Sequence, residues 1–304
     1  MKTSVVLSSF NGEKYIIEQL ESLRTQTLAP DEVIIVDDCS SDSTVSICNR
    51  FIDDNGLSAT WRVIVNSQNK GWAENFSDAF LLASGDLIFP CDQDDIWITD
   101  KLEKMTLIMT EHPEIGLLIG NYMKWIHNDK ENRIAEQNYS GKLIQLPFNE
   151  KVIYMDYPGC VYCFRRSFYN DILPYRFTDY PHDAFLLRMA KTANACYLLD
   201  IPVIKWRRHT ANTTGKPVRT NEEMANRTDY YIKCLQKMKD YCNDHDMTDK
   251  TTLIEENLEF YKVRGAAFRN RRLIGKNSLF SCIKYWRFYP RTRSILGDAW
   301  RLIH

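Results

Sequence analysis

The sequence of 304 residues predicts an α/β fold with a mainly parallel sheet flanked by helices. Short apolar runs alternate with amphipathic segments of helical period, which is typical of right-handed βαβ units. Each apolar run also ends in polar residues, and open parallel sheets bind their ligands at that end of the strands. Four strands are predicted in the first third of the chain, over residues 4–8, 32–36, 61–65 and 87–91.

The helices between these strands are predicted from apolar spacing and start signals. The first has four apolar residues on one face: Tyr15, Ile16, Leu20 and Leu23. Residues 39–44 are rich in N-cap residues and open the second helix. A third is expected at about residues 72–83, and a further strand at residues 195–206.

The composition is that of an ordinary globular protein, with 44% hydrophobic and 26% charged residues. Nine cysteines are scattered without regular spacing, and no secretory signal precedes the first turn. These features favour reduced thiols in a cytosolic protein. Because no apolar run approaches the roughly 20 residues that span a bilayer, we expect a cytoplasmic chain.

The charge and the pattern both change in the last third of the chain. Residues 1–215 form the predicted catalytic domain, and residues 216–304 a helical region. Residues 260–304 carry eleven Lys and Arg against one acid, Asp298, so the rest of the chain has a net charge of −11. This basic, aromatic tail fits an anionic membrane surface, packing on the domain, or a homodimer contact. The acidic main domain opposes nucleic-acid binding.

Three carboxylates follow the strand at residues 87–91: Asp92, Asp94 and Asp95. Like charges this close are costly unless a cation or a set of donors offsets them. Hard oxygen ligands suit Mg²⁺ or Mn²⁺, especially beside a diphosphate. The alternative is a solvated acidic turn that caps the next helix.

Polar residues after the other strands are expected to converge on the same edge of the sheet. They are Ser9, Asn11, Glu13, Asp37, Asp38 and Asn69. There is no Gly-x-Gly-x-x-Gly and no phosphate-binding P-loop. If a nucleotide binds, acidic and amide groups must therefore contact its base and ribose, and a metal must hold its phosphates.

Two later segments offer further candidates. Cys160 and Cys163 form a Cys-x-x-Cys, for which buried thiols are favoured over zinc or redox chemistry because no second pair accompanies it. His182 and Asp183 stand at the start of an apolar helix, where Asp183 fits the role of a helix cap.

Four motifs together carry a family resemblance. Residues 5–12 (VVLSSFNG), 36–44 (VDDCSSDST), 69–71 (NKG) and 92–97 (DQDDIW) occur in this order, and the chain over residues 3–215 resembles the inverting family 2 glycosyltransferases of the GT-A fold. The resemblance implies a base pocket lined by Ser9, Asn11 and Glu13, with Asp37 or Asp38. It also places Asn69 and Asp92 near the ribose and diphosphate, with Asp94 as a metal ligand and Asp95 as its helper.

The resemblance extends to the second half of the site. The acidic residue at the position of Asp183 is the family's general base, which would deprotonate an acceptor hydroxyl. The acceptor or diphosphate side would include Trp97, Gly159, Cys160 and His182. Residues 207–215 are similar to a loop of bacterial rhamnosyltransferases, which implies His209 as a third metal ligand and Arg207 or Arg208 as a diphosphate contact. The family pattern also implies a polar-acidic loop after Gly120, and this chain departs from that pattern at residues 121–132.

The resulting hypothesis is a cytoplasmic inverting glycosyltransferase that depends on Mn²⁺ or Mg²⁺. If the basic tail binds lipid, the protein would be peripheral on the inner face of the plasma membrane. It would move a sugar, with L-rhamnose from dTDP-L-rhamnose the first choice, to a hydroxyl of a cell-surface polysaccharide or lipid-linked glycan precursor. Three alternatives remain: a UDP-sugar transferase of the same family, a metal-dependent nucleotidyltransferase or phosphohydrolase, and a non-catalytic sugar-binding module.

Overall fold

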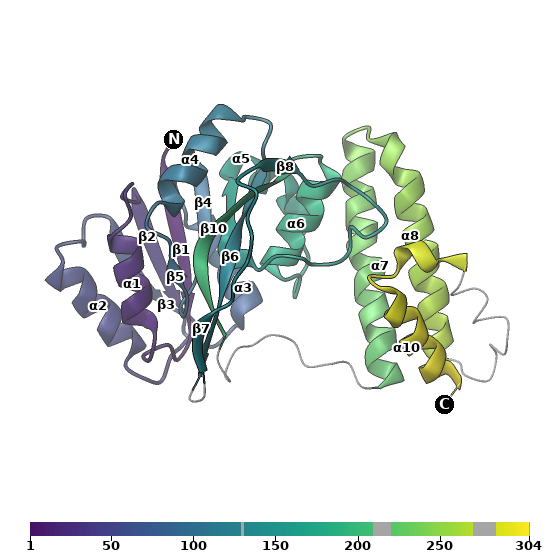
Figure 1. Cartoon of the computed structure of the whole chain (residues 1–304), viewed down its shortest axis with the longest axis horizontal. Helices are drawn as coiled ribbons and strands as arrows, with labels where there is room; N and C mark the ends of the chain where they lie inside the picture. Colours follow the sequence, from purple (N-terminus) through teal and green to yellow (C-terminus); the bar gives the residue numbers. More distant parts are fainter. Residues whose placement is uncertain (129–130, 209–219, 270–283, 304) are drawn as a thin grey trace. The chain divides into compact units, whose positions relative to one another are not determined.

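The computed structural model describes residues 1–128, 131–208, 220–269 and 284–303 (Figure 1). The chain divides into two compact units. The first contains Met1–Leu146 and Asp156–Asn212, and the second contains Pro147–Met155 and Thr213–His304. Residues 147–155 thus leave the α/β unit and join the helical one, an excursion that no local sequence signal indicates.

The amino-terminal half of the sheet consists of alternating strands and helices (Figure 1). In sheet order its parallel strands are β3 (Trp61–Val65), β2 (Glu32–Asp37), β1 (Thr3–Ser9) and β4 (Leu87–Asp92). The helices between them are α1 (Ile16–Arg24), α2 (Thr44–Asp54) and α3 (Trp72–Leu81). All seven elements lie where the sequence predicts them. β2 is buried at every position, as expected for a strand covered on both faces.

The sheet continues from β4 through strands of mixed direction. They are β9 (Tyr162–Arg165), β6 (Leu117–Asn128), β10 (Cys196–Arg208) and β5 (Ile96–Trp97). β9 is antiparallel to both of its neighbours, whereas β6 and β10 are parallel. Two short strands, β7 (Glu131–Ile134) and β8 (Leu143–Gln145), pair antiparallel with β6 and β10.

The remaining elements of this unit are short helices. They are α4 (Lys101–Glu111), the 3₁₀ turn η1 (Gly159–Val161), α5 (Arg166–Ile172), the 3₁₀ turn η2 (Leu173–Tyr175) and α6 (His182–Thr192). α6 begins at the predicted His-Asp pair, and η1 leads directly into β9.

Two expectations for this unit are corrected. The chain departs from the family's polar-acidic loop after Gly120. In its place the described residues form the second half of β6 and the start of β7, because β10 runs beside β6 as far as Arg208 and pairs with it. The turn at Asp94–Asp95 does not cap a helix. It leads into β5, which pairs with β10, and α4 begins only at Lys101, with Asp100 as its N-cap.

The second unit is helical, as predicted. Its elements are α7 (Asn221–Asp244), α8 (Thr248–Arg269), the 3₁₀ turn η3 (Trp286–Phe288) and α10 (Thr292–Ile303). α7 opens with a capping box between Thr220 and Glu223. Arg264 of α8 forms a buried bidentate ion pair with Asp298 of α10. None of the described helices is both long and apolar enough to cross a membrane.

Candidate functional site

The carboxyl ends of β1, β2 and β4 bring the first predicted site residues to one edge of the sheet. Ser9 lies opposite Asp37 in the β1–β2 register, and Asp92 lies opposite Ser8 in the β1–β4 register. The Ser9 hydroxyl donates to Asp37 Oδ1 over 2.8 Å. Asp37 is fully buried and also accepts hydrogen bonds from the Ser40 amide and hydroxyl. It therefore organises the loop after β2 from inside.

Asp38 organises a second loop. Its Oδ1 accepts hydrogen bonds from Asn66 Nδ2 and the Lys70 amide, and its Oδ2 accepts one from the Gly71 amide. Gly71 has φ +82°, a conformation that glycine adopts without steric cost. The exposed Asn69 also accepts from the Gly71 amide, at 3.0 Å. Asp38 and Asn69 thus hold the turn that precedes α3.

Asn11 and Glu13 are exposed in the loop after β1 and connect it to the loop after β2. Asn11 Oδ1 accepts from the Ser41 amide at 2.9 Å, and Glu13 Oε2 accepts from the Ser43 amide at 3.0 Å. Asn11 has φ +47°, in the left-handed region that asparagine tolerates better than most residues. The two loops therefore form one connected polar surface at the sheet edge.

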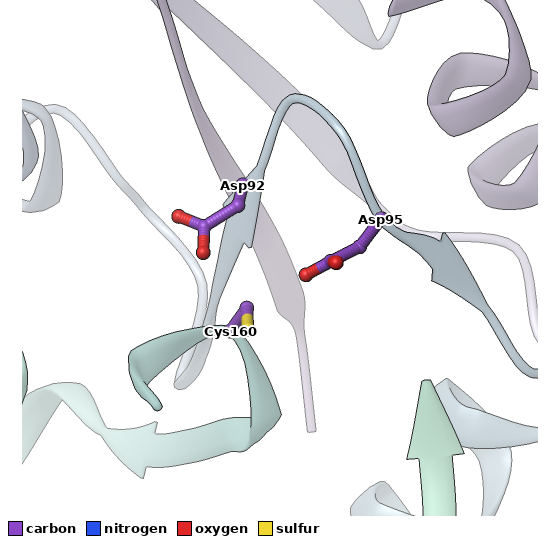
Figure 2. A group of neighbouring side chains, drawn as sticks. All are labelled: Asp92, Asp95 and Cys160. Atoms are coloured by element: carbon purple, nitrogen blue, oxygen red, sulfur yellow. The ribbon is translucent and has the colours of Figure 1, made fainter. Parts of the chain in front are cut away.

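The acidic cluster consists of Asp92, Asp95 and Cys160. One ligand atom of each lies within 4.8 Å of the others, a spacing that could hold a metal ion. Figure 2 shows the three side chains around one space: Asp92 at the end of β4, Asp95 in the turn before β5, and Cys160 in η1. Asp95 Oδ1 accepts from the Arg207 amide at 2.9 Å. Its buried Oδ2 has no hydrogen-bond partner within the described part of the chain.

The electrostatics of the cluster agree with this geometry. Burial and the neighbouring charges of Asp94 and Asp183 raise the pKa of Asp92 to about 7. Burial, Asp94 and Asp92 also raise the pKa of Asp95 well above its ordinary range. A divalent cation would offset this repulsion and satisfy Asp95 Oδ2, so these residues fit one. Asp94, the predicted metal ligand, is half-buried beside the group and is not a member of it.

Lys101 lies beneath the cluster and is completely buried. Its Nζ donates to the Cys160 carbonyl over 2.7 Å and lies 3.5 Å from the centre of the Trp97 ring. Burial, together with the carboxylates of Asp95 and Asp92, raises the pKa of the Cys160 thiol, which therefore stays protonated. The carboxylates, and not sulfur, are then the better ligands for a hard cation.

Gly159 packs tightly against the start of α6. A Cβ on Gly159 would lie 2.6 Å from His182 Nε2 and 3.1 Å from Asp183 Cβ. This contact places Asp183 beside the turn that carries Cys160. The charge of Asp183 also contributes to the raised pKa of Asp92. The predicted base therefore lies close to the acidic cluster.

His182 is a buried, neutral residue in this packing. Its ring lies 4.1 Å, centroid to centroid, from that of Phe76 and 5.8 Å from that of Trp72. Burial lowers the pKa of His182 to about 4. Its Nδ1 has no hydrogen-bond partner among the described residues. His182 consequently supports Gly159 and Asp183 from behind.

Asp183 lies in the first turn of α6, where the N-cap is Pro181. Its Oδ1 accepts from the Ala184 amide at 2.7 Å. The carboxylate thus stands at the positive end of the helix without being its N-cap. It is half-buried and so remains open to solvent on one side.

The end of β10 carries the last predicted candidates. Arg207 is 1% exposed, and its Nε donates to the Asp94 carbonyl over 2.7 Å. Arg208 is half-buried, with its guanidinium carbon 4.6 Å from the centre of the Trp206 ring. His209, the predicted third metal ligand, lies outside the described residues.

Sequence reasoning missed two residues of this site. Lys101 opens α4, and a lysine at the positive end of a helix is unfavourable, which could have indicated a distant partner. Trp72 opens α3 and is 46% exposed beside His182. A large exposed aromatic directly after a glycine turn at a strand end is the signal that could have singled it out.

Known proteins resemble this chain in sequence. The Glycosyl transferase family 2 profile matches residues 4–173, more than half of the chain. The glucosyltransferase WfgD of Escherichia coli, UDP-Glc:alpha-D-GlcNAc-diphosphoundecaprenol beta-1,3-glucosyltransferase, is 34% identical over 119 residues, which cover 39% of this chain and 45% of that protein. The dTDP-rhamnosyl transferase RfbG of Shigella flexneri is 27% identical over 231 residues, which cover 69% and 73%. The match thus spans less than half of WfgD.

Solved structures share the fold. TarS 1–349 of S. aureus, in complex with UDP-GlcNAc, has a TM-score of 0.62 at 17% identity, over 94% of this chain and 90% of that one. The mannosyltransferase PcManGT of Pyrobaculum calidifontis, in complex with GDP-Man and Mn²⁺, has a TM-score of 0.52 at 15% identity, over 99% and 85%. Together with the profile match, these likenesses show that the chain has the GT-A fold and belongs to glycosyl transferase family 2.

Proposed function

We propose that the chain is an inverting, divalent-cation-dependent glycosyltransferase that moves a sugar from a nucleoside diphosphate to an acceptor hydroxyl. The observation that carries the proposal is the position of Asp183. This half-buried carboxylate lies against Gly159, next to Cys160 of the acidic cluster, and its charge acts on Asp92. A base and a diphosphate site so arranged can act on opposite sides of an anomeric carbon.

The acidic cluster is the proposed cation site. The resemblance assigns Asp94, with His209, to the cation, whereas the structure brings together the carboxylates of Asp92 and Asp95. Oxygen ligands and the unsatisfied Asp95 Oδ2 suit Mn²⁺ or Mg²⁺. When bound, such an ion offsets the charge that develops on a departing nucleoside diphosphate.

The nucleotide is proposed to bind on the connected loops after β1, β2 and β3. Its base would contact the surface held together by Ser9, Asn11, Glu13, Asp37 and Asp38. Asn69 and Asp92 would face the ribose and diphosphate, and Arg208 is the retained candidate for a diphosphate contact. The exposed amide and carboxylate groups of Asn11 and Glu13 support this assignment.

Asp183 is the proposed general base. Its carboxylate would accept the proton of the acceptor hydroxyl as that oxygen attacks the anomeric carbon. A single displacement inverts the anomeric carbon, so no enzyme nucleophile is needed. Trp97, Cys160 and His182 are all buried, so their proposed role is to support the acceptor-binding surface from inside the protein. Trp72, exposed next to His182, offers an aromatic face on which a sugar ring can stack.

The donor sugar is proposed to be L-rhamnose from dTDP-L-rhamnose. This choice is supported by the likeness to RfbG, which covers more than two thirds of both chains. WfgD is named for a UDP-glucose donor, and TarS was solved with UDP-GlcNAc, so a UDP-sugar is the alternative within the family. The proposed acceptor is a cell-surface polysaccharide or a lipid-linked glycan precursor, used on the cytoplasmic side.

Residues 260–304 are proposed to bind an anionic membrane surface. Trp286, Leu296 and Trp300 are exposed in this basic region. Exposed aromatics interleaved with cations suit the interface of an anionic bilayer. Co-sedimentation with anionic liposomes that falls as salt rises is the expected result. If the chain stays in the supernatant at every salt concentration, the surface serves another role, such as a homodimer contact.

The catalytic proposal is tested by calorimetric titration of the purified chain with dTDP, UDP and GDP, each with Mn²⁺ or with EDTA. Nucleoside diphosphate release is then followed from dTDP-L-rhamnose, UDP-glucose and UDP-GlcNAc. Cation-dependent binding and release from one sugar nucleotide is expected. Formation of a nucleoside triphosphate and a sugar 1-phosphate on addition of pyrophosphate would favour a nucleotidyltransferase, and formation of a nucleoside monophosphate and a sugar 1-phosphate would favour a phosphohydrolase. Binding of a sugar without any turnover would favour a non-catalytic module.

A further inference from the structure

The guanidinium of Arg207 lies inside the protein, close to two aromatic rings. Its carbon is 4.5 Å from the centre of the Tyr15 ring and 4.1 Å from that of Trp125. The Arg207 side chain has 0% exposure, and its Nη2 pairs with Glu18 Oε2 at 2.6 Å. The planar, delocalised guanidinium suits this stacked position, which an ammonium group would fill poorly.

Arg207 also forms two hydrogen bonds with the Asp94–Asp95 turn. Its Nε donates to the Asp94 carbonyl over 2.7 Å, and its main-chain amide donates to Asp95 Oδ1 over 2.9 Å. With Oδ1 held in this way, the unsatisfied Oδ2 of Asp95 is left for the group that contains Asp92 and Cys160. The main-chain bond to Asp95 Oδ1 would form with any residue except proline, whereas the bond to the Asp94 carbonyl needs the arginine side chain.

Burying an arginine side chain costs more free energy than burying an apolar side chain of similar size. Removing the guanidinium charge from water is unfavourable. Its carboxylate partner Glu18 is 51% exposed, so the ion pair contributes little stabilising free energy in compensation. An apolar side chain would pack there at lower cost. The features that an apolar residue could not supply are the hydrogen bond to Asp94 and the link from the turn to α1.

We propose that Arg207 is a positioning residue that holds the Asp94–Asp95 turn in the conformation that binds the divalent cation and the diphosphate. This inference rests on the proposed function, because it assumes that the acidic cluster is the cation site. In this proposal Arg207 acts through the turn, because its side chain is completely buried. It joins β10, α1 and the acidic turn, three elements far apart in the sequence.

The test compares Arg207→Met and Arg207→Lys with the wild type, using calorimetric titration with Mn²⁺ alone and with Mn²⁺ plus UDP, dTDP or GDP. Arg207→Met is expected to weaken cation-dependent nucleotide binding by about 10–100-fold, as residues that orient metal ligands do. Arg207→Lys keeps the charge but has a single nitrogen in place of the two that bond the Asp94 carbonyl and Glu18, so its loss should be intermediate. Circular dichroism confirms that each variant is folded.

Arg165→Met is the matched control. Arg165 also donates to main-chain carbonyls, including that of Ile115 at 2.7 Å. It pairs with Leu87 at the amino end of β4, and so lies at the sheet edge opposite the acidic turn. Its loss should lower stability and leave nucleotide affinity at the wild-type value. A matching affinity loss in Arg165→Met would reduce the Arg207 effect to general destabilisation and overturn the inference.

Glu18→Gln provides a second variant in case Arg207→Met does not fold. Glu18 is exposed, so the substitution leaves the core intact while weakening the anchor of the guanidinium. A smaller affinity loss in the same direction is expected. Wild-type affinity in Glu18→Gln and Arg207→Lys would overturn the inference alone. Absence of cation-dependent nucleotide binding by the wild type would overturn the proposed function together with it.

Discussion

Lys101 donates a 2.7 Å hydrogen bond from Nζ to the main-chain carbonyl of Cys160. Lys101 is the first residue of α4, and Cys160 lies in η1, the turn whose Gly159 packs against Asp183. The bond therefore connects α4 to that turn. Because Lys101 is completely buried, the bond spans a part of the protein that water does not reach. Lys101 thus places a buried ammonium group beside the acidic cluster.

Stability should depend on pH through Lys101. Burial lowers the pKa of Lys101 from 10.5 to about 8, against the opposing influence of Cys91, Cys160 and Asp95. The unfolded chain therefore binds more protons between pH 8 and 10.5, and this group's contribution to stability rises with pH in that window. In Lys101→Met that rise is absent, while the unpaired Cys160 carbonyl costs about 1–3 kcal/mol at any pH.

The free energy of unfolding of the wild type and of Lys101→Met is measured by urea unfolding at one pH below and one pH above the pKa of Lys101. The variant should be more destabilised, relative to wild type, at the higher pH. Lys104→Met is the control, since Lys104 is exposed and pairs with Asp100 in the same helix. Equal destabilisation of Lys101→Met at both pH values would contradict the prediction.

Gly159→Ala should destabilise the protein by about 1–3 kcal/mol, the usual cost of overpacking. The added methyl would meet His182 Nε2 at 2.6 Å. Adding His182→Ala opens that space, so thermodynamic coupling between the two substitutions should appear in a double-mutant cycle. Gly297→Ala is the control, because its Cβ would meet nothing within 4 Å. Additive effects of Gly159→Ala and His182→Ala would show that the contact is not what excludes a side chain.

The effect of Mn²⁺ should grow with pH. The pKa of Asp92 is raised from 3.8 to about 7, so the stability gained from its protonated form is present below pH 3.8 and is lost as pH rises through 7. A cation prefers the ionised form and should restore that stability. The Mn²⁺-induced shift in Tm is therefore expected to increase between pH 5 and 8. In Asp92→Asn the shift should be smaller, and the pH dependence that remains should come from Asp95, whose pKa is also raised; an unchanged profile would remove Asp92 from the cation site.

Local signals predicted the amino-terminal half of the fold closely. β3 lies at residues 61–65, as expected, because an apolar run bounded by turn residues needs no distant information. The second half of β6 was not predicted to be a strand, since its polar residues become one only through pairing with β10. The excursion of residues 147–155 into the helical unit depends in the same way on tertiary contacts.

The candidate site shows the same division. Consecutive carboxylates after a strand could be recognised in the sequence, and so could the His182–Asp183 pair at a helix start. Which aspartates face one another could not, because Asp95 is oriented by Arg207 from a strand 112 residues away. The pairing of Arg207 with Glu18 spans 189 residues and has no sequence pattern of its own.

Asp298→Asn should loosen α10 in the helical unit. Asp298 accepts two hydrogen bonds from Arg264 and one from the Tyr289 hydroxyl, all buried. Neutralising one partner of a buried pair leaves the other charge uncompensated and costs about 3–5 kcal/mol. Faster amide hydrogen exchange in α10 is the expected readout. Glu256→Gln breaks the exposed pair with Arg287 and should cost no more than about 1 kcal/mol; equal effects of the two variants would refute the distinction.

Asp183→Asn separates chemistry from binding. The amide keeps the size and the hydrogen bond to the Ala184 amide but cannot accept a proton, so transfer should fall by about 10²–10⁴-fold while donor affinity is unchanged. Calorimetry with the donor nucleotide and Mn²⁺, beside nucleoside diphosphate release, measures both quantities. Asp179→Asn, an exposed neighbour on the same segment, should leave both at wild-type values. Lost donor affinity in Asp183→Asn would assign the carboxylate to the nucleotide site, and unchanged transfer would exclude it as the base.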